Sequence, residues 1–376
     1  MKSIHEILET AIAQKASDVI IKTGCPPTFR VDGNLVSAGN EPLTFQDVEE
    51  LIHSIIYSAT RDYLLQMGTS VTKFTGEELV DRRVKTLRDM DEIDLVFTID
   101  GLVRVRSNLF LQRNMVAAAL RLVPIVPQTI EELNLPPILK EWADQPHGLV
   151  IVTGPTGSGK STTVAAMVDY INSTRKSHVI TVEDPIEHVF QDKKSVINQR
   201  EVGSDTKSYS AALRSVLRQT PDVIVIGEMR DVETMEVAIT AGEVGHLVIT
   251  TLHTTSAVVT VDRILNSFPA ESRQQVALQL SAGLVGITSQ RLALQASGQG
   301  RLPAVEIMTG SPTVKKMIED RDTGELYSAI RDGIHFGMCT MNQDLERLCK
   351  EKKITADEAI QHSTNPAELK QILRHA

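Results

Sequence analysis

The segment GLVIVTGPTGSGKSTT at residues 148–163 constrains the fold of this 376-residue chain more than any other segment. Four consecutive apolar residues from Leu149 predict a short buried strand, and the loop after them has the spacing G-x-x-x-x-G-K-[ST]. Apolar residues then recur at intervals of three and four, at Val164, Met167 and Ile171, which predicts a helix. A strand, a glycine-rich loop and a helix in this order make a P-loop, which predicts an α/β domain.

The residue types in this loop suit phosphate binding. Glycines let the backbone approach an oxyanion closely, so successive N–H groups can surround phosphates at the positive end of the next helix. Lys160 is expected to contact the β- and γ-phosphates of ATP, and the Ser161 hydroxyl to bind Mg²⁺. The alternative is a glycine-rich turn that binds nothing. The expected nucleotide-binding residues of the loop are Gly154, Pro155, Thr156, Gly157, Ser158, Gly159, Lys160, Ser161 and Thr162.

The composition is that of an ordinary globular protein, with 41% hydrophobic and 23% charged residues. The formal net charge of −9 disfavours nucleic acid as a direct partner, because surfaces that bind phosphate backbones are rich in Lys and Arg. The three cysteines are not spaced as in a zinc ribbon, and no apolar run approaches the roughly 18 residues that span a bilayer. We therefore expect a cytoplasmic protein without membrane insertion, which docks at a membrane only through a partner.

Residues 1–123 predict an α+β domain. It opens with an amphipathic helix at 3–16 and contains two Asp-Gly hairpin turns, at 32–33 and 100–101. A charged stretch at about 61–92 interrupts it, and we interpret this stretch as a solvated helix or a flexible insertion.

Residues 138–376 predict a second, α/β domain, joined to the first through a proline-rich linker at 124–137. Three apolar runs without alternation, VITV, VIVI and LVITTL, are typical of strands covered on both faces. They predict a mostly parallel sheet between helical layers. From about residue 311, where Ser311 precedes a proline, the pattern becomes helical, so a helical bundle should close the chain.

Acidic residues follow two of these runs, at the carboxyl edge where ligands bind in open α/β sheets. Glu183, Asp184 and Glu187 come after VITV and favour a contact with the nucleotide; the alternative is a cluster that complements a helix N-terminus. Glu228 comes after VIVI, where it can polarise the attacking water. The residue before it is glycine, where many P-loop enzymes carry a metal-binding Asp. Metal contact would then depend on the P-loop serine, on water and on the earlier acidic cluster.

Two histidines, His246 and His253, frame the LVITTL run. A histidine near a sheet is more often structural than functional. Two of them around a strand beside the P-loop strand favour a sensor of the γ-phosphate, mostly at His253.

Four arginines, Arg104, Arg106, Arg113 and Arg121, lie in the second hairpin and its continuation. Arginines that alternate with apolar residues are typical of a solvated sheet face. The functional alternative is an arginine presented to a nucleotide on another domain or subunit, where it would stabilise γ-phosphate charge in the transition state.

The motifs of the second domain resemble, in the same order, the secretion-superfamily ATPases of bacterial type IV pili and type II secretion. The resemblance rests on GPTGSGKST, the acidic box TVEDPIEHVF, the segment NQREVGSDTKSYSAALRSVLRQTPDVIVIGEMRD and the histidine box GHLVITTLHTTSA. The N-terminal ASDVIIKTGCPPTFRVDGNL resembles the pilus-retraction group of PilT and PilU type. RVRSNLFLQRNMVAAALRLVP and FGMCTMNQDLERL resemble its PilU-like branch, while SAIRDGIHFGM departs from the C-terminal signature of the main retraction motor.

This resemblance implies a PAS-like N-terminal domain and a RecA-like ATPase domain with a C-terminal helical bundle. It implies a homo-hexameric ring with ATP and Mg²⁺ between subunits, which powers or assists type IV pilus retraction. The ring would act at the pilus base, on the cytoplasmic side of the inner membrane. Its partners would be the inner-membrane pilus platform protein and a paralogous retraction ATPase.

The resemblance also implies roles for residues. Glu228 would be the catalytic glutamate, assisted by Glu187 and His253. Arg106 and Arg121 match the N-domain arginines that complete the site, with Arg113 as a weaker third, so the resemblance favours the functional reading of the arginines. The other residues that it places at the nucleotide are Glu183, Asp184 and His246.

Three alternatives stay open at this point. An assembly, secretion or DNA-uptake ATPase of the same superfamily usually carries a further N-terminal domain and a four-cysteine metal module, for which this chain has neither the length nor the cysteines. A RecA-like DNA translocase is disfavoured by the acidic net charge. A non-catalytic nucleotide-binding module is disfavoured by the intact Lys160, Ser161 and Glu228.

Overall fold

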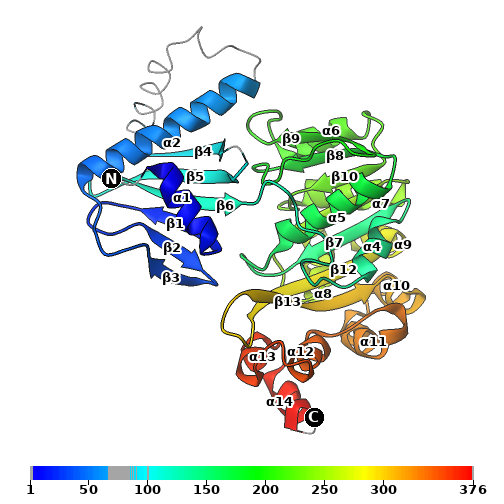
Figure 1. The fold of residues 1–376 in the computed structure, drawn as a ribbon. Helices are drawn as coiled ribbons and strands as arrows, with labels where there is room; N and C mark the ends of the chain where they lie inside the picture. Colours follow the sequence, from blue (N-terminus) through cyan, green and yellow to red (C-terminus); the bar gives the residue numbers. More distant parts are fainter. Residues whose placement is uncertain are drawn as a thin grey trace. The chain divides into compact units, whose positions relative to one another are not determined.

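The structure of the protein, a computed structural model, describes residues 3–66, 85, 87, 89, 91–99 and 101–374. The chain divides into two units, Met1–Val126 and Pro127–Ala376, each with its own core (Figure 1). The boundary falls inside the proline-rich segment at 124–137. From Pro127 onward this segment belongs to the second unit, because Ile130 and Leu135 are buried in its core.

The first unit is an antiparallel sheet of six strands in the order β3-β2-β1-β6-β5-β4. Apolar residues of two helices form one core with those of the sheet. Its elements are α1 (Ile4–Ala13), β1 (Ala16–Ile21), β2 (Thr28–Val31), β3 (Asn34–Ser37), α2 (Phe45–Gln66), β4 (Glu92–Ile99), β5 (Val103–Gln112) and β6 (Met115–Val123).

The predicted opening helix is confirmed as α1. It begins at a capping box of Ser3 and Glu6 and buries the apolar stripe that the spacing indicated. The predicted turn at 32–33 joins β2 to β3, and both of its residues have a positive φ, 48° and 88°, as a two-residue hairpin turn of type I′ requires. Asp100 of the second turn and most of the charged stretch at about 61–92 lie outside the described residues.

The second unit contains a sheet of seven strands in the order β13-β12-β7-β11-β10-β8-β9. All neighbouring strands are parallel except β12 and β13. The three apolar runs are the strands β8, β10 and β11, as expected. The strands are β7 (Gly148–Thr153), β8 (His178–Glu183), β9 (Val196–Glu201), β10 (Val223–Ile226), β11 (Leu247–Leu252), β12 (Leu284–Leu294) and β13 (Arg301–Thr309).

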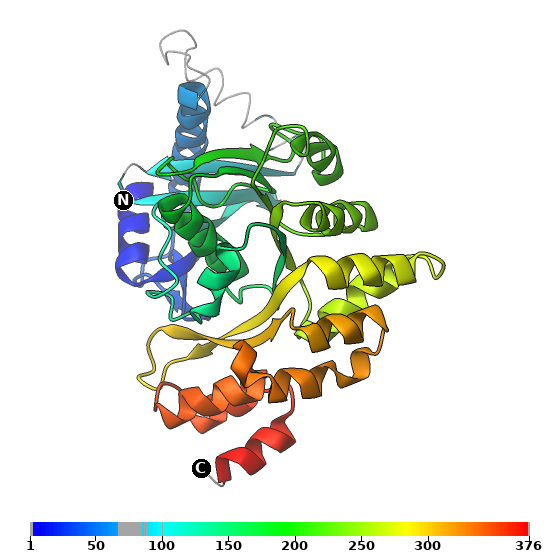
Figure 2. The ribbon, with the colours of Figure 1, turned by 90° about the vertical axis from the view of Figure 1, so that its right-hand side faces the viewer.

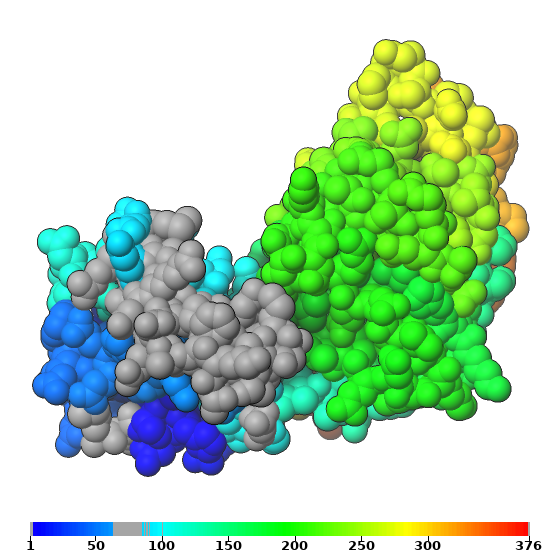
Figure 3. All heavy atoms as spheres, turned by 90° about the horizontal axis from the view of Figure 1, so that it is seen from above, coloured from blue at the N-terminus to red at the C-terminus, as the bar shows by residue number. Residues whose placement is uncertain are grey.

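Helices cover both faces of this sheet. Leu149 and Ile151 of β7 pack into one core with α6 to α9, whereas Val150 and Val152 pack into another with α4 and α5. Burial on both sides explains the absence of polar alternation. In Figure 3 the part from β8 to α7 is green, and α8 and α9, in yellow, project beyond it. These helices are α4 (Ile138–Ala143), α5 (Lys160–Thr174), α6 (Tyr209–Val216), α7 (Val232–Glu243), α8 (Ala257–Ser267) and α9 (Arg273–Gly283).

Short helices close the chain beside β12 and β13 (Figure 2). The predicted helix start is confirmed: the Ser311 hydroxyl accepts a hydrogen bond from the N–H of Val314, and Pro312 is the first residue of α10. Leu345, Leu348 and other apolar residues of the last helices form a separate cluster with residues of β12 and β13. The helices are α10 (Pro312–Glu319), α11 (Leu326–Asp332), α12 (Met341–Lys350), α13 (Ala356–His362) and α14 (Pro366–Arg374).

The fold class agrees with the prediction. The first unit is α+β, and the second is a P-loop α/β unit with a helical C-terminal part. Of the helices in the described ranges, none is long and apolar enough to cross a bilayer.

Candidate nucleotide-binding site

The P-loop lies at the carboxyl end of β7 and leads directly into α5. Gly154, Gly157 and Gly159 have φ values of 143°, 77° and 87°, in the region that strains other residues. A Cβ on Gly154 would also lie 2.4 Å from the carbonyl oxygen of Gln290 on β12. Glycine is therefore required at this position, and the loop presents the first N–H groups of α5 as a phosphate site.

The Lys160 side chain folds back onto the loop. Its ammonium group donates hydrogen bonds to the carbonyls of Gly154 (2.9 Å) and Pro155 (3.0 Å), and the residue is only 8% exposed. Burial lowers the pKa of Lys160, and the negative charge of Glu187 acts in the opposite direction. Phosphate oxygens can replace the two carbonyls as acceptors, so the lysine is close to where it would bind a nucleotide.

A buried glutamine of β12 contacts the same loop. Nε2 of Gln290 donates to the carbonyl oxygen of Ser158 (2.7 Å), and Oε1 of Gln290 accepts from the hydroxyl of Thr163 on α5 (2.9 Å). Neither Gln290 nor Thr163 was predicted as a site residue. Thr163 directly follows the predicted loop residues, whereas Gln290 is 127 positions further along the sequence, where no local motif marks it.

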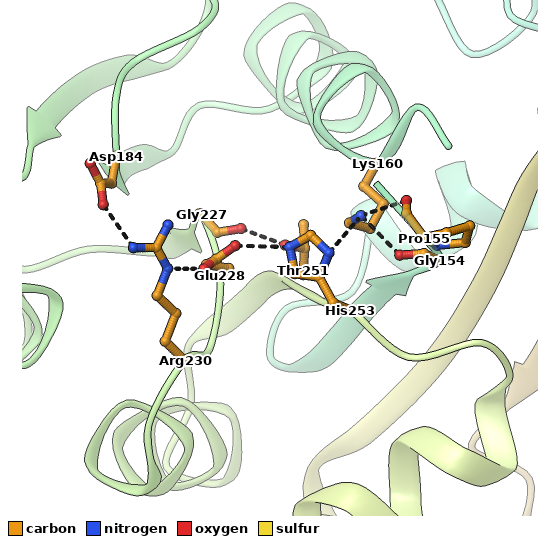
Figure 4. A network of polar contacts seen from close by, with 9 residues as sticks. All are labelled: Gly154, Pro155, Lys160, Asp184, Gly227, Glu228, Arg230, Thr251 and His253. Atoms are coloured by element: carbon orange, nitrogen blue, oxygen red, sulfur yellow. Dashed lines mark hydrogen bonds and ion pairs between the residues drawn. The ribbon is translucent and has the colours of Figure 1, made fainter. Parts of the chain in front are cut away.

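A chain of polar contacts connects the P-loop with the neighbouring strand ends (Figure 4). Lys160 Nζ lies 3.4 Å from Nδ1 of His253, and Nε2 of His253 lies 3.0 Å from Oε2 of Glu228. The other carboxylate oxygen of Glu228 accepts from Arg230, whose Nη1 lies 3.1 Å from Oδ2 of Asp184. The order β7-β11-β10-β8 brings these groups to one edge of the sheet. Arg230 was not predicted as a site residue, although it lies within the GEMRD segment.

The contacts of His253 determine its tautomer. The carboxylate of Glu228 can only accept, so Nε2 carries the proton, and Nδ1 is then free to accept from the ammonium of Lys160. Burial, together with the positive charges of Lys160 and Arg230, lowers the pKa of His253. The ring is therefore neutral near pH 7 and connects a cation with an anion.

The glycine before Glu228 has no room for the Asp that many P-loop enzymes carry. A Cβ on Gly227 would lie 2.8 Å from the hydroxyl oxygen of Tyr209 and 3.3 Å from the carbonyl oxygen of Val182. At the start of α5, the side chain of Ser161 is exposed and makes no hydrogen bond to the described part of the chain. A free hydroxyl oxygen suits Mg²⁺, which prefers oxygen ligands.

The three residues of the acidic box differ in their contacts. Glu183, the last residue of β8, accepts from the Thr181 hydroxyl (2.6 Å) and the Gln199 amide (3.1 Å), and burial raises its pKa. Asp184 belongs to the chain of contacts in Figure 4. Glu187 lies close enough to Lys160 for its negative charge to oppose the burial that lowers the pKa of the lysine. Asp184 and Glu187 therefore face the candidate site, whereas Glu183 is held by β8 and β9.

His246 lies at the amino end of β11, the opposite end from His253. Its Nδ1 is 2.9 Å from the carbonyl oxygen of Pro221. The structure therefore does not bring His246 together with the P-loop of the same chain.

The predicted arginines belong to the sheet of the first unit. Arg106 on β5 and Arg121 on β6 are directly opposite each other in the ladder. Nε of Arg121 lies 3.2 Å from Oδ1 of Asp18, and the side chain of Arg121 is still 51% exposed. Arg113 lies between β5 and β6 with a positive φ of 49°. Because the side chain of Arg121 is half exposed, its guanidinium has further N–H donors that can contact another group.

Known proteins resemble this chain over nearly its whole length. Residues 1–362 match the family model described as type II/IV secretion system protein. The type IV pilus retractation ATPase PilT of Pseudomonas aeruginosa is 41% identical, over 96% of this chain and 98% of that protein. The type IV pilus ATPase PilU of the same bacterium is 33% identical, over 98% and 91%. A crystal structure of the pilus retraction motor PilT with bound ADP matches with a TM-score of 0.81 and 40% identity, over 99% of this chain and 100% of that one.

These matches include both units and the P-loop. Identity is higher to the relative named PilT than to the one named PilU, so the expected closeness to the PilU-like branch does not appear in these values. The wider resemblance is confirmed. This chain belongs to the type II/IV secretion system protein family and, within it, to the retraction ATPases of PilT and PilU type.

Proposed function

We propose that this protein is a hexameric, Mg²⁺-dependent ATPase motor that drives type IV pilus retraction. The observation that carries the proposal is the contact chain from Lys160 through His253 to Glu228. It connects a phosphate-binding lysine with a carboxylate that can act on water, and its two ends follow β7 and β10, two strands that are separated only by β11. Such an arrangement suits hydrolysis better than nucleotide binding alone.

In the proposed reaction, ATP phosphates take Lys160 away from its carbonyl partners on the P-loop. Glu228 orients the attacking water and accepts its proton, as a positioned carboxylate does in general base catalysis. The neutral His253 ring holds the Glu228 carboxylate and is displaced from Lys160 when the γ-phosphate arrives. His253 therefore reports whether the γ-phosphate is present.

Mg²⁺ fits the oxygen donors at the start of α5. Ser161 would hold it together with water and the phosphates of ATP, and Asp184 and Glu187 would act through that water. When bound, Mg²⁺ neutralises the charge that develops on the phosphates.

Arg106 and Arg121 would complete the site from a neighbouring subunit, with Arg113 as a weaker third. The half-exposed guanidinium of Arg121 supports this role. An arginine beside the γ-phosphate stabilises the charge of the transition state, and an arginine from the next subunit couples hydrolysis to ring geometry. A homo-hexamer with six such composite sites is the proposed assembly.

The proposed place of action is the pilus base, on the cytoplasmic side of the inner membrane. The proposed partners are the inner-membrane platform protein and a paralogous retraction ATPase. The relatives support this role, because they carry the names of a pilus retraction ATPase and a pilus ATPase.

The test compares wild type with Glu228→Gln and with the matched control Glu236→Gln, which changes an exposed glutamate of α7 in the same way. ATPase rate is measured against protein concentration with light-scattering mass, and pilus retraction is measured in a deletion strain that carries each variant. We expect the rate per chain to rise as the ring forms. Glu228→Gln should lower it by roughly a hundredfold or more and abolish retraction, because a positioned base contributes about that much.

Glu236→Gln should behave as wild type in both measurements. A rate that does not depend on concentration would contradict the ring. Normal retraction with Glu228→Gln would contradict the motor role, and full ATPase activity with that variant would contradict the assignment of Glu228.

A further inference from the structure

Gln290 lies on β12 but makes several contacts with the P-loop, which follows β7. Its amide donates to the carbonyl oxygen of Ser158 (2.7 Å) and accepts from Thr163 (2.9 Å). Its backbone carbonyl lies 2.4 Å from the position of a Cβ on Gly154, and its Nε2 lies 3.2 Å from that of a Cβ on Gly159. A single side chain and its backbone thus approach the first glycine of the loop, its last glycine and the first turns of α5.

The direction of the amide follows from its partners. The carbonyl of Ser158 can only accept, so the NH₂ group of Gln290 faces it, and Oε1 faces Thr163. The hydroxyl of Thr163 must then donate to Oε1. Gln290 and Thr163 are 1% and 2% exposed, so water does not compete for these hydrogen bonds. The orientation of the amide is therefore fixed from both sides.

The bond to Ser158 has a consequence for the next residue. In a trans peptide the carbonyl of one residue and the N–H of the following residue point in opposite directions. A carbonyl of Ser158 that points toward Gln290 therefore turns the N–H of Gly159 away from β12. Gly159 caps α5, and its N–H donates no hydrogen bond within the described part of the chain, as is usual for the first N–H groups of a helix.

We propose that Gln290 is a positioning residue of the nucleotide site, which holds the Ser158–Gly159 peptide so that the Gly159 N–H can donate to a phosphate oxygen. Thr163 holds the Gln290 amide in the required direction. Gln290 does not touch the nucleotide in this role. The inference needs only nucleotide binding by the P-loop and does not depend on the ring or the pilus.

The experiment measures ADP binding to the full-length chain by isothermal titration calorimetry, and thermal unfolding without nucleotide. Gln290→Leu removes the amide and should raise the dissociation constant for ADP about tenfold, which is the value of one well-placed hydrogen bond to a charged group. Thr163→Val should weaken binding in the same direction, and Thr163→Ser, which keeps the hydroxyl, should restore it. The double variant Gln290→Leu/Thr163→Val should bind like Gln290→Leu alone, because both changes break one unit.

Thr288→Val is the matched control. Its hydroxyl is also buried in β12, but it has no hydrogen-bond partner within the described residues. This variant should bind ADP as wild type does.

Three outcomes would overturn the inference: Gln290→Leu binding ADP within about twofold of wild type, Thr288→Val losing as much affinity, or Thr163→Ser binding as weakly as Thr163→Val. If Gln290→Leu does not fold, the comparison of Thr163→Val with Thr163→Ser tests the inference. Thr163→Val that binds ADP as tightly as wild type would then overturn it. Wild-type protein that fails to bind ADP would instead contradict the nucleotide site itself.

Discussion

The ring of His253 lies between the ammonium of Lys160 and the carboxylate of Glu228. Burial and two positive charges, those of Lys160 and Arg230, lower its pKa. We expect the ring to titrate below the ordinary histidine value of about 6.5. In Lys160→Ala the pKa should rise, because one of the positive charges that disfavour the protonated ring is gone. NMR of protein labelled with ¹³C-histidine, recorded across pH and assigned with His253→Gln, measures both values.

Lys176→Ala, which removes an exposed lysine, is the control for this titration and should leave the His253 signal unchanged. A pKa of His253 at or above about 6.5 in wild type, or an unchanged pKa of His253 in Lys160→Ala, would contradict the contact between His253 and Lys160. The lowered pKa of His253 also affects stability. The folded chain binds this proton less readily than the unfolded chain, so the contribution of His253 to the free energy of unfolding declines as pH falls below about 6.5.

Residues that recur in a local motif could be predicted, whereas residues that meet only through folding could not. Lys160 and Glu228 were identified from loop spacing and from their place after an apolar run, and the structure connects them through His253. Gln290 supports the same loop but was not predicted, because its contacts depend on β12 lying beside β7. His246 was predicted because it shares a motif with His253, but folding places it away from the P-loop, at the other end of the strand.

At the scale of elements, a buried carboxylate connects two helix starts. Glu306 on β13 is 1% exposed; its Oε1 accepts from the N–H of Ala257 at the start of α8 (2.7 Å), and it also accepts from the backbone of Met341 at the start of α12. We expect Glu306→Leu to lower the free energy of unfolding by about 3 kcal/mol, because two buried N–H groups lose their acceptor. Glu306→Gln should cost less, because its side-chain oxygen still accepts.

Urea unfolding followed by tryptophan fluorescence measures this difference. The only tryptophan of the chain, Trp142, is buried in the second unit, so the signal reports on that unit. Equal stability of the Leu and Gln variants would contradict the role of Glu306 as an acceptor for the two helices.

Elements that carry their own pattern were predicted, and elements that depend on their neighbours were missed. The runs VITV, VIVI and LVITTL are apolar throughout because helices cover both of their faces, so they could be identified as strands. β12 and β13 have mixed composition and extend beyond the other strands, where they contact the last helices, so no simple periodicity marked them. The proline-rich segment at 124–137 was expected as a linker, but Ile130 and Leu135 in it pack into the second unit.

At the scale of the whole molecule, the proposed ring requires Arg121 and Glu228 of one active site to come from different subunits. Arg121→Ala alone should lower the ATPase rate roughly a thousandfold, as expected for an arginine beside the γ-phosphate. Glu228→Gln alone should also be inactive. Mixing the two inactive proteins should restore part of the activity, because an Arg121→Ala subunit keeps Glu228 and can receive Arg121 from a Glu228→Gln neighbour. The rate of the mixture is measured against each protein alone at the same total concentration, after time for subunits to exchange.

The control is the double variant Arg121→Ala/Glu228→Gln, which cannot form an intact site. If the arginine acted within its own chain, every subunit in the mixture would lack one of the two groups, and the mixture would stay as inactive as its components. Recovery thus separates an arginine that acts on a neighbouring subunit's site from one that acts within its own chain.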